Sequence, residues 1–215
     1  MEGWVLAGGA SVRMGRDKAL LEIGGRLLIV LALDKLRALG MEPRIAGSRP
    51  DLAGFAPVVS DNFPRCGPLA GIEAALAASD ADLHFFLPVD LPELPFEFLV
   101  WMAQRAQASG ATATLPLLAG RPQPLCAVYS RRLLPGLREA LAARRYKVMP
   151  AIETAACGSV DAFEVEALAA ALIPETWPAE PPVHDWFRNL NTPEDYERLH
   201  RSPPATGAKR HNPIS

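Results

Sequence analysis

Short apolar segments alternate with longer segments of helical periodicity along most of this chain. The strand-like segments are residues 3–6, 43–47, 56–60, 83–87, 112–117, 124–129 and 160–165, with a further candidate at 187–190. The helix-like segments are residues 26–39, 69–78, 95–108, 131–143 and 149–156, and a last helix is expected to start at Thr192. Because each helix must bury an apolar stripe, this alternation predicts an α/β fold with helices on both faces of a sheet.

Length and composition are those of a single domain with an ordinary core. Of the 215 residues, 49% are apolar and 21% are charged, and the formal net charge is −2. This balance excludes a broadly basic surface for nucleic acid, and the longest apolar runs are too short to cross a bilayer. The segment after His200 lacks any apolar period. We therefore predict one domain over residues 1–200, a disordered tail over residues 201–215, and neither a nucleic-acid nor a membrane partner.

The cysteines and the N-terminus both favour a cytoplasmic protein. Cys66, Cys126 and Cys157 are widely spaced and form no CxxC pair, which argues against disulfides and against a zinc site. The first strand-like segment begins at residue 3, so the chain lacks the layout of a signal peptide. Cys66 precedes Gly67 in an expected loop, and its role stays open.

Ligands of open α/β sheets bind beyond the carboxyl ends of strands, and the first such loop combines glycines with cations. It reads LAGGASVRMGRDKAL from residue 6 to residue 20. Gly8 and Gly9 allow a sharp turn whose N–H groups can cradle phosphate, while Arg13 offers a fork for phosphate and Lys18 a point charge. Neither a Walker A loop nor a dinucleotide fingerprint fits the spacing. The alternative is a plain glycine turn with solvated cations.

Two further loops contribute carboxylates. Asp61 opens the loop DNFPRCGPLAG, where it could accept a hydrogen bond from a sugar hydroxyl or a base amine, and Gly67 allows a ligand to approach the backbone. Asp90 follows the most apolar strand-like segment, in PVDLP, and is suited to a hard cation such as Mg²⁺. The alternatives are an Asx turn at Asp61 and a helix cap at Asp90.

Taken together, these loops predict a site for a nucleoside triphosphate with Mg²⁺. None of the four histidines falls in the loops, and the sequence shows no pair of nucleophile and general base. Phosphoryl transfer can proceed by positioning and electrostatics without a protein nucleophile, so this absence agrees with the prediction. His84 is expected to be a core or strand residue.

The motifs resemble those of the MobA-like nucleotidyltransferases. LAGGASVRMGRDKAL looks like the signature LAGGxSxRMGxDKxL of that family, and GPLAGIEAAL, PVDLP, RPQPLCAVYSRRLLPGL and NLNTPEDY match further blocks in the same order. The resemblance extends over residues 3–200 and is strongest to the molybdenum cofactor guanylyltransferases. It implies a Rossmann-like domain with a mixed, mostly parallel sheet between helices, and Mg²⁺ as cofactor.

The resemblance also implies a reaction and a set of site residues. GMP would pass from GTP to the terminal phosphate of molybdenum-bound molybdopterin, with release of pyrophosphate. Arg13, Lys18 and Asp90 would be catalytic, and Asp90 would also bind the metal. The implied nucleotide-binding residues are Leu6, Ala7, Gly8, Gly9, Lys18, Ser48, Asp61, Gly67 and Asp90. Asn189 and Asn191 would lie near the pterin.

The chain departs from the family pattern at two positions, and some alternatives stay open. Val89 stands where a cysteine often precedes the metal aspartate, and Ser48 stands near the place of a nucleotide-contacting asparagine, which bears on base selection.

The rival functions are cytidylyl transfer, transfer to a sugar-phosphate acceptor, and a non-catalytic regulatory domain. Arg144, Arg145 and Lys147 could receive the pterin phosphate, bind a cofactor-biosynthesis protein or an apo-molybdoenzyme, or form a solvated helix start.

Overall fold

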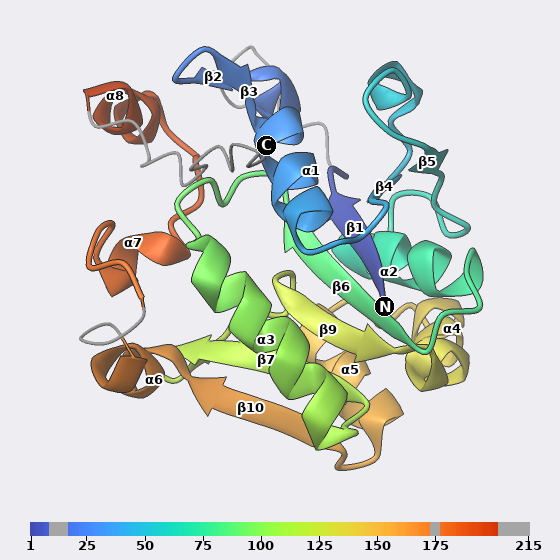
Figure 1. The fold of residues 1–215 in the computed structure, drawn as a ribbon. Coiled ribbons are helices and arrows are strands. Elements are labelled where there is room, and N and C mark those ends of the chain that lie inside the picture. The colour runs from blue at the N-terminus through green and yellow to red at the C-terminus, as the bar shows by residue number, and fades with distance from the viewer. Residues whose placement is uncertain (9–16, 173–176, 202–215) are drawn as a thin grey trace, which may run out of the picture.

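A mixed eight-stranded sheet forms the centre of the computed structural model, which describes residues 1–8, 17–172 and 177–201 (Figure 1). Seven strands follow the order β10-β7-β9-β6-β1-β4-β5, and β8 pairs with β7 off this path. The strands are β1 (Glu2–Leu6), β4 (Arg44–Ala46), β5 (Val58–Val59), β6 (Leu83–Pro88), β7 (Ala113–Leu118), β8 (Arg121–Pro122), β9 (Ala127–Ser130) and β10 (Val160–Glu164). Strands β6, β1, β4 and β5 are mutually parallel, so their carboxyl ends share one edge.

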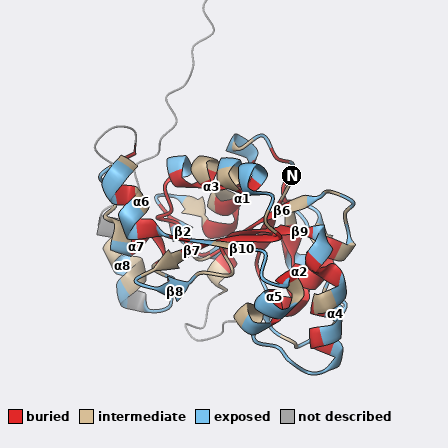
Figure 2. Ribbon diagram, turned by 90° about the horizontal axis from the view of Figure 1, so that it is seen from below, coloured by how far each residue is buried: buried red, intermediate tan, exposed pale blue. Residues whose placement is uncertain are grey.

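Helices cover both faces of this sheet, as the alternation predicts (Figure 2). One core packs under α1 (Leu28–Ala38), α3 (Phe96–Ser109) and α6 (Val165–Leu172), and the other packs under α2 (Pro68–Ala77), α4 (Leu134–Ala142) and α5 (Val148–Ala156). In β1, Val5 belongs to the first core while Trp4 and Leu6 belong to the second. This alternation follows from the two-residue period of a strand. Full burial of such side chains contributes roughly 1.5–3 kcal/mol each. The predicted Rossmann-like α/β domain is therefore confirmed.

Several elements differ from the expectation. Residues 187–190 form no strand: α7 (Val183–Trp186) ends just before them, and Phe187 and Leu190 are buried in the core under α3. These apolar side chains pack without strand pairing, which a short apolar run cannot reveal. A small hairpin of β2 (Glu22–Ile23) and β3 (Arg26–Leu27) takes the first two residues of the expected helix 26–39. Helices α6 and α7 and strand β8 were not anticipated.

The last helix, α8 (Pro193–Arg201), begins where its sequence signals place it. Thr192 Oγ1 accepts a hydrogen bond from Asp195 N at 3.2 Å, and Asp195 Oδ2 accepts from the backbone N–H groups of Asn191 and Thr192. This reciprocal capping fixes the chain on either side of Thr192. Residues 202–215, most of the predicted tail, lie outside the described residues.

Within the described ranges, no helix is long and apolar enough to cross a membrane. His84 is fully buried in β6, where its Nδ1 accepts a hydrogen bond from Trp4 Nε1 at 3.0 Å, and its Nε2 lies 2.8 Å from Ala81 O. The expectation that His84 is a core residue is confirmed.

Candidate functional site

A pocket of about 640 Å³ opens beyond the carboxyl ends of β1, β4, β5 and β6. Eight of the residues expected to bind nucleotide line it: Leu6, Ala7, Gly8, Lys18, Ser48, Asp61, Gly67 and Asp90. They come together because the parallel strands end at one edge of the sheet, where ligands of open α/β folds bind. Two further predicted residues, Gly9 and Arg13, lie outside the described part of the chain.

Two backbone segments that line the pocket approach each other closely. Gly47 follows β4 with φ +133°, a conformation that side chains with a Cβ rarely adopt. A Cβ at Gly47 would lie 3.0 Å from both Cα and N of Gly8, so a larger residue would push the two loops apart. The contact leaves the backbone of Gly8 and Gly47 at the pocket surface, where a flat or charged ligand could lie against it.

Lys18 and Asp90 meet in this pocket although 72 residues separate them. The Lys18 ammonium lies 3.3 Å from Asp90 Oδ2 and also donates to Asn191 Oδ1. The side chain of Lys18 is 14% exposed and that of Asp90 is 21% exposed, so the pair is only partly screened by water. The site thus joins the first loop, the loop after β6 and the segment before α8.

Asp61 contributes a buried acceptor that has no partner within the described structure. Its Oδ1 is inaccessible to solvent and makes no hydrogen bond, while its backbone N–H donates to Ser48 Oγ at 3.3 Å. Burial, and to a lesser degree the charge of Glu73, raise the pKa of Asp61 above its usual value. The helix that follows is capped by Gly67, not by Asp61. An orphaned buried acceptor of this kind is costly unless a ligand supplies a donor.

The loop after Asp90 is held from both sides. From α1, Lys35 Nζ donates to the carbonyl oxygens of Pro92 at 2.7 Å and Leu94 at 2.9 Å, and burial lowers the pKa of Lys35 from 10.5 to about 8. From α8, Arg198 forms a bidentate ion pair with Glu93. Asp90 does not cap α3, because the N-cap of that helix is Pro95. The helix-cap alternative for Asp90 is therefore wrong.

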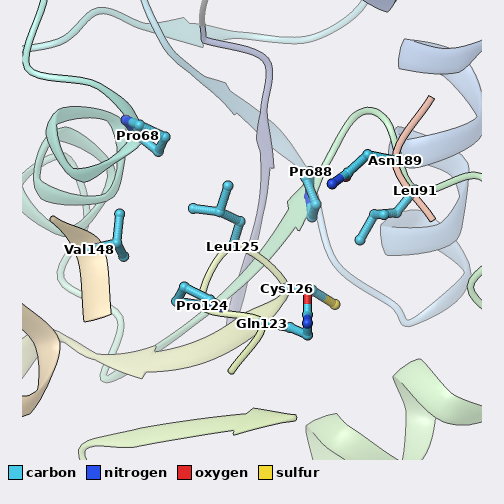
Figure 3. A pocket seen from close by; sticks show the side chains of 9 residues that line it. All are labelled: Pro68, Pro88, Leu91, Gln123, Pro124, Leu125, Cys126, Val148 and Asn189. Atoms are coloured by element: carbon cyan, nitrogen blue, oxygen red, sulfur yellow. The ribbon is translucent and has the colours of Figure 1, made fainter. Parts of the chain in front are cut away.

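A second pocket, of about 250 Å³, adjoins the first and shares Pro68, Pro88 and Leu125 with it. Asn189, predicted to lie near the pterin, lines this second pocket. In Figure 3 it lies beside Leu91, across the pocket from Pro68 and Val148. The remaining lining residues are Gln123, Pro124 and Cys126. Burial raises the pKa of Cys126 to about 12, so its thiol stays protonated at neutral pH. The other predicted pterin residue, Asn191, faces Lys18 instead.

Several residues of the site escaped the sequence reasoning. Arg49 and Asp17 line the first pocket and form an ion pair with each other, and Lys35 and Glu93 support the loop after Asp90. Asp17 directly precedes Lys18, and Arg49 directly follows Ser48, so adjacency to predicted residues was the available signal. No local sequence pattern predicts that Asp17 and Arg49 pair, because 32 residues separate them.

The described residues hold no cluster of three or more His, Cys, Asp or Glu side chains that could bind a metal ion. Of the three carboxylates that line the first pocket, Asp17 is paired with Arg49, while Asp90 has the Asn191 amide oxygen nearby, both in contact with Lys18. Such a sparse oxygen set fits Mg²⁺, which keeps several waters and completes its coordination with substrate phosphates. It does not fit a structural zinc site, which needs four protein ligands.

Comparison with known proteins identifies the family of this chain. Residues 3–155 match the MobA-like NTP transferase domain. A molybdenum cofactor guanylyltransferase of Rhodopseudomonas palustris is 35% identical, over 92% of this chain and 91% of its own length. A probable molybdenum cofactor guanylyltransferase of Carboxydothermus hydrogenoformans is 31% identical, over 91% of this chain and 92% of its own length.

A solved structure shares the fold of this chain. Molybdopterin-guanine dinucleotide biosynthesis protein A from Archaeoglobus fulgidus superposes with a TM-score of 0.74, at 24% identity, over 94% of this chain and 97% of that one. At this identity the likeness concerns the fold, and the domain match and the relatives carry the family assignment. The chain belongs to the MobA-like NTP transferase family.

Proposed function

We propose that this enzyme transfers GMP from GTP to the terminal phosphate of a molybdopterin-type acceptor and releases pyrophosphate. The observation that carries the proposal is the pair of adjoining pockets: one with glycine backbone, Lys18, Asp61 and Asp90, the other with Asn189. A donor nucleotide and an acceptor need such neighbouring sites. The relatives named molybdenum cofactor guanylyltransferase supply the identity of the base and the acceptor.

The first pocket would take the nucleotide. The backbone at Leu6, Ala7 and Gly8 would lie against it, and the unpartnered Asp61 oxygen would accept from a ribose hydroxyl or a base amine. Gly67, the N-cap of α2, has φ +71° and offers a further backbone approach at a helix N-terminus, which favours negative charge. Gly9 and Arg13 keep their predicted roles, nucleotide binding for Gly9 and catalysis for Arg13, as part of this proposal.

The chemistry requires no general base. A phosphate monoester has a second pKa near ~6, so the acceptor phosphate is already largely ionised at neutral pH. The barrier comes from repulsion between two polyanions, and a cation close to the α-phosphate lowers it. Lys18 is the described cation best placed for this task, because it lines the pocket and its ammonium lies 3.3 Å from Asp90.

Asp90 would hold a divalent cation, with Mg²⁺ as the proposed metal. When bound, the metal would neutralise phosphate charge and stabilise the leaving pyrophosphate. Lys18 contacts both Asp90 and Asn191. The chain's own part would be to hold one carboxylate at the strand end and one ammonium beside it.

The second pocket would take the acceptor. Asn189 supplies amide groups on one side of it, and the apolar side chains of Leu91, Leu125 and Val148 suit a flat ring system. Arg144, Arg145 and Lys147 are exposed just before Val148 and would attract the acceptor phosphate or a delivering protein. We propose a cytoplasmic setting, consistent with three free cysteines, Cys66, Cys126 and Cys157.

The decisive experiment measures pyrophosphate release from purified protein with molybdopterin and each of the four nucleoside triphosphates. Release with GTP alone among them is the expected result. Release with CTP would indicate cytidylyl transfer, and turnover with a sugar 1-phosphate would indicate a different acceptor class. Binding of GTP in calorimetry without any release would indicate a regulatory nucleotide-binding domain.

A further inference from the structure

We propose that Arg49 is a positioning residue: it fixes Asp17 against the end of β1 and thereby sets the place of Lys18, without touching the nucleotide itself. The inference rests on the proposed function for its kinetic consequence. Arg49 lines the nucleotide pocket and its side chain is only 13% exposed, so its sequence position beside Ser48 would suggest a phosphate ligand.

The hydrogen bonds of the guanidinium exclude that simple role. An arginine has five N–H donors, and Arg49 makes five hydrogen bonds within the protein. Nε and Nη2 donate to Asp51, at 2.9 and 2.6 Å. Nη1 and Nη2 donate to Asp17, and Nη1 also reaches Ala7 O at 3.4 Å. No donor of Arg49 is left for a phosphate oxygen.

The bonds connect Arg49 to the residue that places Lys18. Asp17 Oδ1 also accepts from Ala19 N at 2.9 Å, which caps the short 3₁₀ helix Lys18–Leu20. Leu20 N donates to Asp17 O at 3.1 Å, so the backbone on both sides of Lys18 is fixed to Asp17. Arg49 thus ties this turn to Ala7 at the end of β1, and the Lys18 ammonium reaches Asp90 from the turn.

The fork of Arg49 is essential to this arrangement, since a lysine offers charge from one point and cannot bond both oxygens of Asp17 and the Ala7 carbonyl in the same geometry. A small displacement of a catalytic cation can cost ~100-fold in rate. The rate should therefore depend on Arg49 even though it contacts no substrate.

The test compares Arg49→Lys, Arg49→Gln, Asp17→Asn and the double variant Arg49→Gln/Asp17→Asn in steady-state pyrophosphate release. We expect each single variant to lower kcat by roughly 10- to 100-fold with little change in KM for GTP. The double variant should be no slower than the slower single variant, because one interaction is lost in all of them. Asp51→Asn is the matched control: it removes the exposed carboxylate from the same guanidinium and should stay within about 2-fold of wild type.

Two results would overturn the proposal. One is an Arg49→Lys enzyme that keeps its kcat while Arg49→Gln raises KM for GTP, which is the signature of a direct charge contact with the nucleotide. The other is a double variant whose loss of kcat equals the combined losses of the two single variants.

A second arm of the experiment needs no turnover. Amide hydrogen exchange of the ligand-free protein over residues 17–21 should become faster in Arg49→Gln and remain unchanged in Asp51→Asn. Unchanged exchange in Arg49→Gln would also refute the positioning role. If the wild-type protein fails to release pyrophosphate, the proposed function is wrong, and the exchange arm still decides the role of Arg49.

Discussion

At the scale of single residues, the site depends on charges that the fold brings together from distant parts of the chain. Lys18 is partly buried and bonded to two oxygen acceptors, Asp90 Oδ2 and Asn191 Oδ1. The sequence assigned two cations, Arg13 and Lys18, to catalysis, and Lys18 is the one that lies within the described residues. Its contribution is therefore directly testable.

Lys18→Ala should lower the rate of pyrophosphate release about 100-fold or more, because the charge would act on the transition state. The measurement is kcat with saturating GTP and acceptor. Arg37→Ala, which removes an exposed cation paired with Asp34, is the control and should leave kcat within about 2-fold. A fully active Lys18→Ala enzyme would contradict the assigned role.

Asp90→Asn should weaken the dependence of the rate on Mg²⁺, since the proposed metal would lose its protein carboxylate. A magnesium titration of the rate is the measurement, and the half-saturating concentration should rise about 10-fold or more, the cost of ~1.4 kcal/mol or more in binding. An unchanged titration curve would remove Asp90 as the ligand. Glu22→Gln, an exposed carboxylate in the hairpin of β2 and β3, serves as the matched control.

His84 predicts a specific pH dependence of stability. Burial lowers the pKa of His84 below its ordinary value of 6.5, and the hydrogen bond to Ala81 opposes this only in part. As the pH falls through 6.5, the unfolded state therefore takes up a proton before the folded state does. The free energy of unfolding should fall between pH 6.5 and pH 5.

Denaturant unfolding at a series of pH values measures this effect. His84→Gln should remove this component of the acid dependence. At pH 7.5 the substitution should lower the free energy of unfolding by about 1 kcal/mol, because it perturbs the hydrogen bond from Trp4. Identical pH profiles for the wild type and the variant would show that the imidazole does not couple to folding.

At the scale of elements, α4 and α5 pack so closely that one position excludes any side chain. A Cβ at Gly136 in α4 would lie 2.6 Å from Ala155 Cβ and 2.9 Å from Ala155 Cα in α5. The helices cannot move apart without opening the core on that face of the sheet. That core lies next to Val148, which lines the second pocket.

Gly136→Ala should destabilise the protein by about 1–3 kcal/mol, because overpacking outweighs the gain in helix propensity. The free energy of unfolding from denaturant melts tests this. Gly54→Ala is the matched control, since nothing lies within 4 Å of a Cβ there, and its effect should be within about 0.5 kcal/mol. Equal stability of the two variants would contradict the packing argument.

At the scale of the whole molecule, the segment around α8 is joined to the loop after Asp90, 105 residues earlier. Glu93 is 7% exposed and bonded by the two terminal nitrogens of Arg198, and Leu190 N donates to Asp90 O at 3.2 Å. This docking sets where Asn191 meets Lys18. Asn189 thus reaches the second pocket, and Asn191 reaches Lys18, from beyond the 3–155 range that matches the family domain.

Arg198→Leu should destabilise the protein by about 2–4 kcal/mol, because it leaves the Glu93 carboxylate buried without its partner. The double variant Glu93→Leu/Arg198→Leu should recover much of that loss, since the unpaired charge is gone. Denaturant unfolding measures both. A double variant as unstable as the sum of the two single variants would show that the two residues do not act as a pair.

Local sequence patterns by themselves determined the main elements of the sheet and its covering helices, the loops that would form the site, and the residues Lys18, Asp61 and Asp90 within them. These features depend on periodicity, turn residues and the shared edge of parallel strands, all of which are local or follow from fold class. The tertiary structure alone decided that Phe187 and Leu190 pack without forming a strand, that Asn191 reaches Lys18, and that every donor of Arg49 is taken. The reason is physical: hydrogen-bond satisfaction and side-chain packing between distant segments are fixed only when the chain closes on itself.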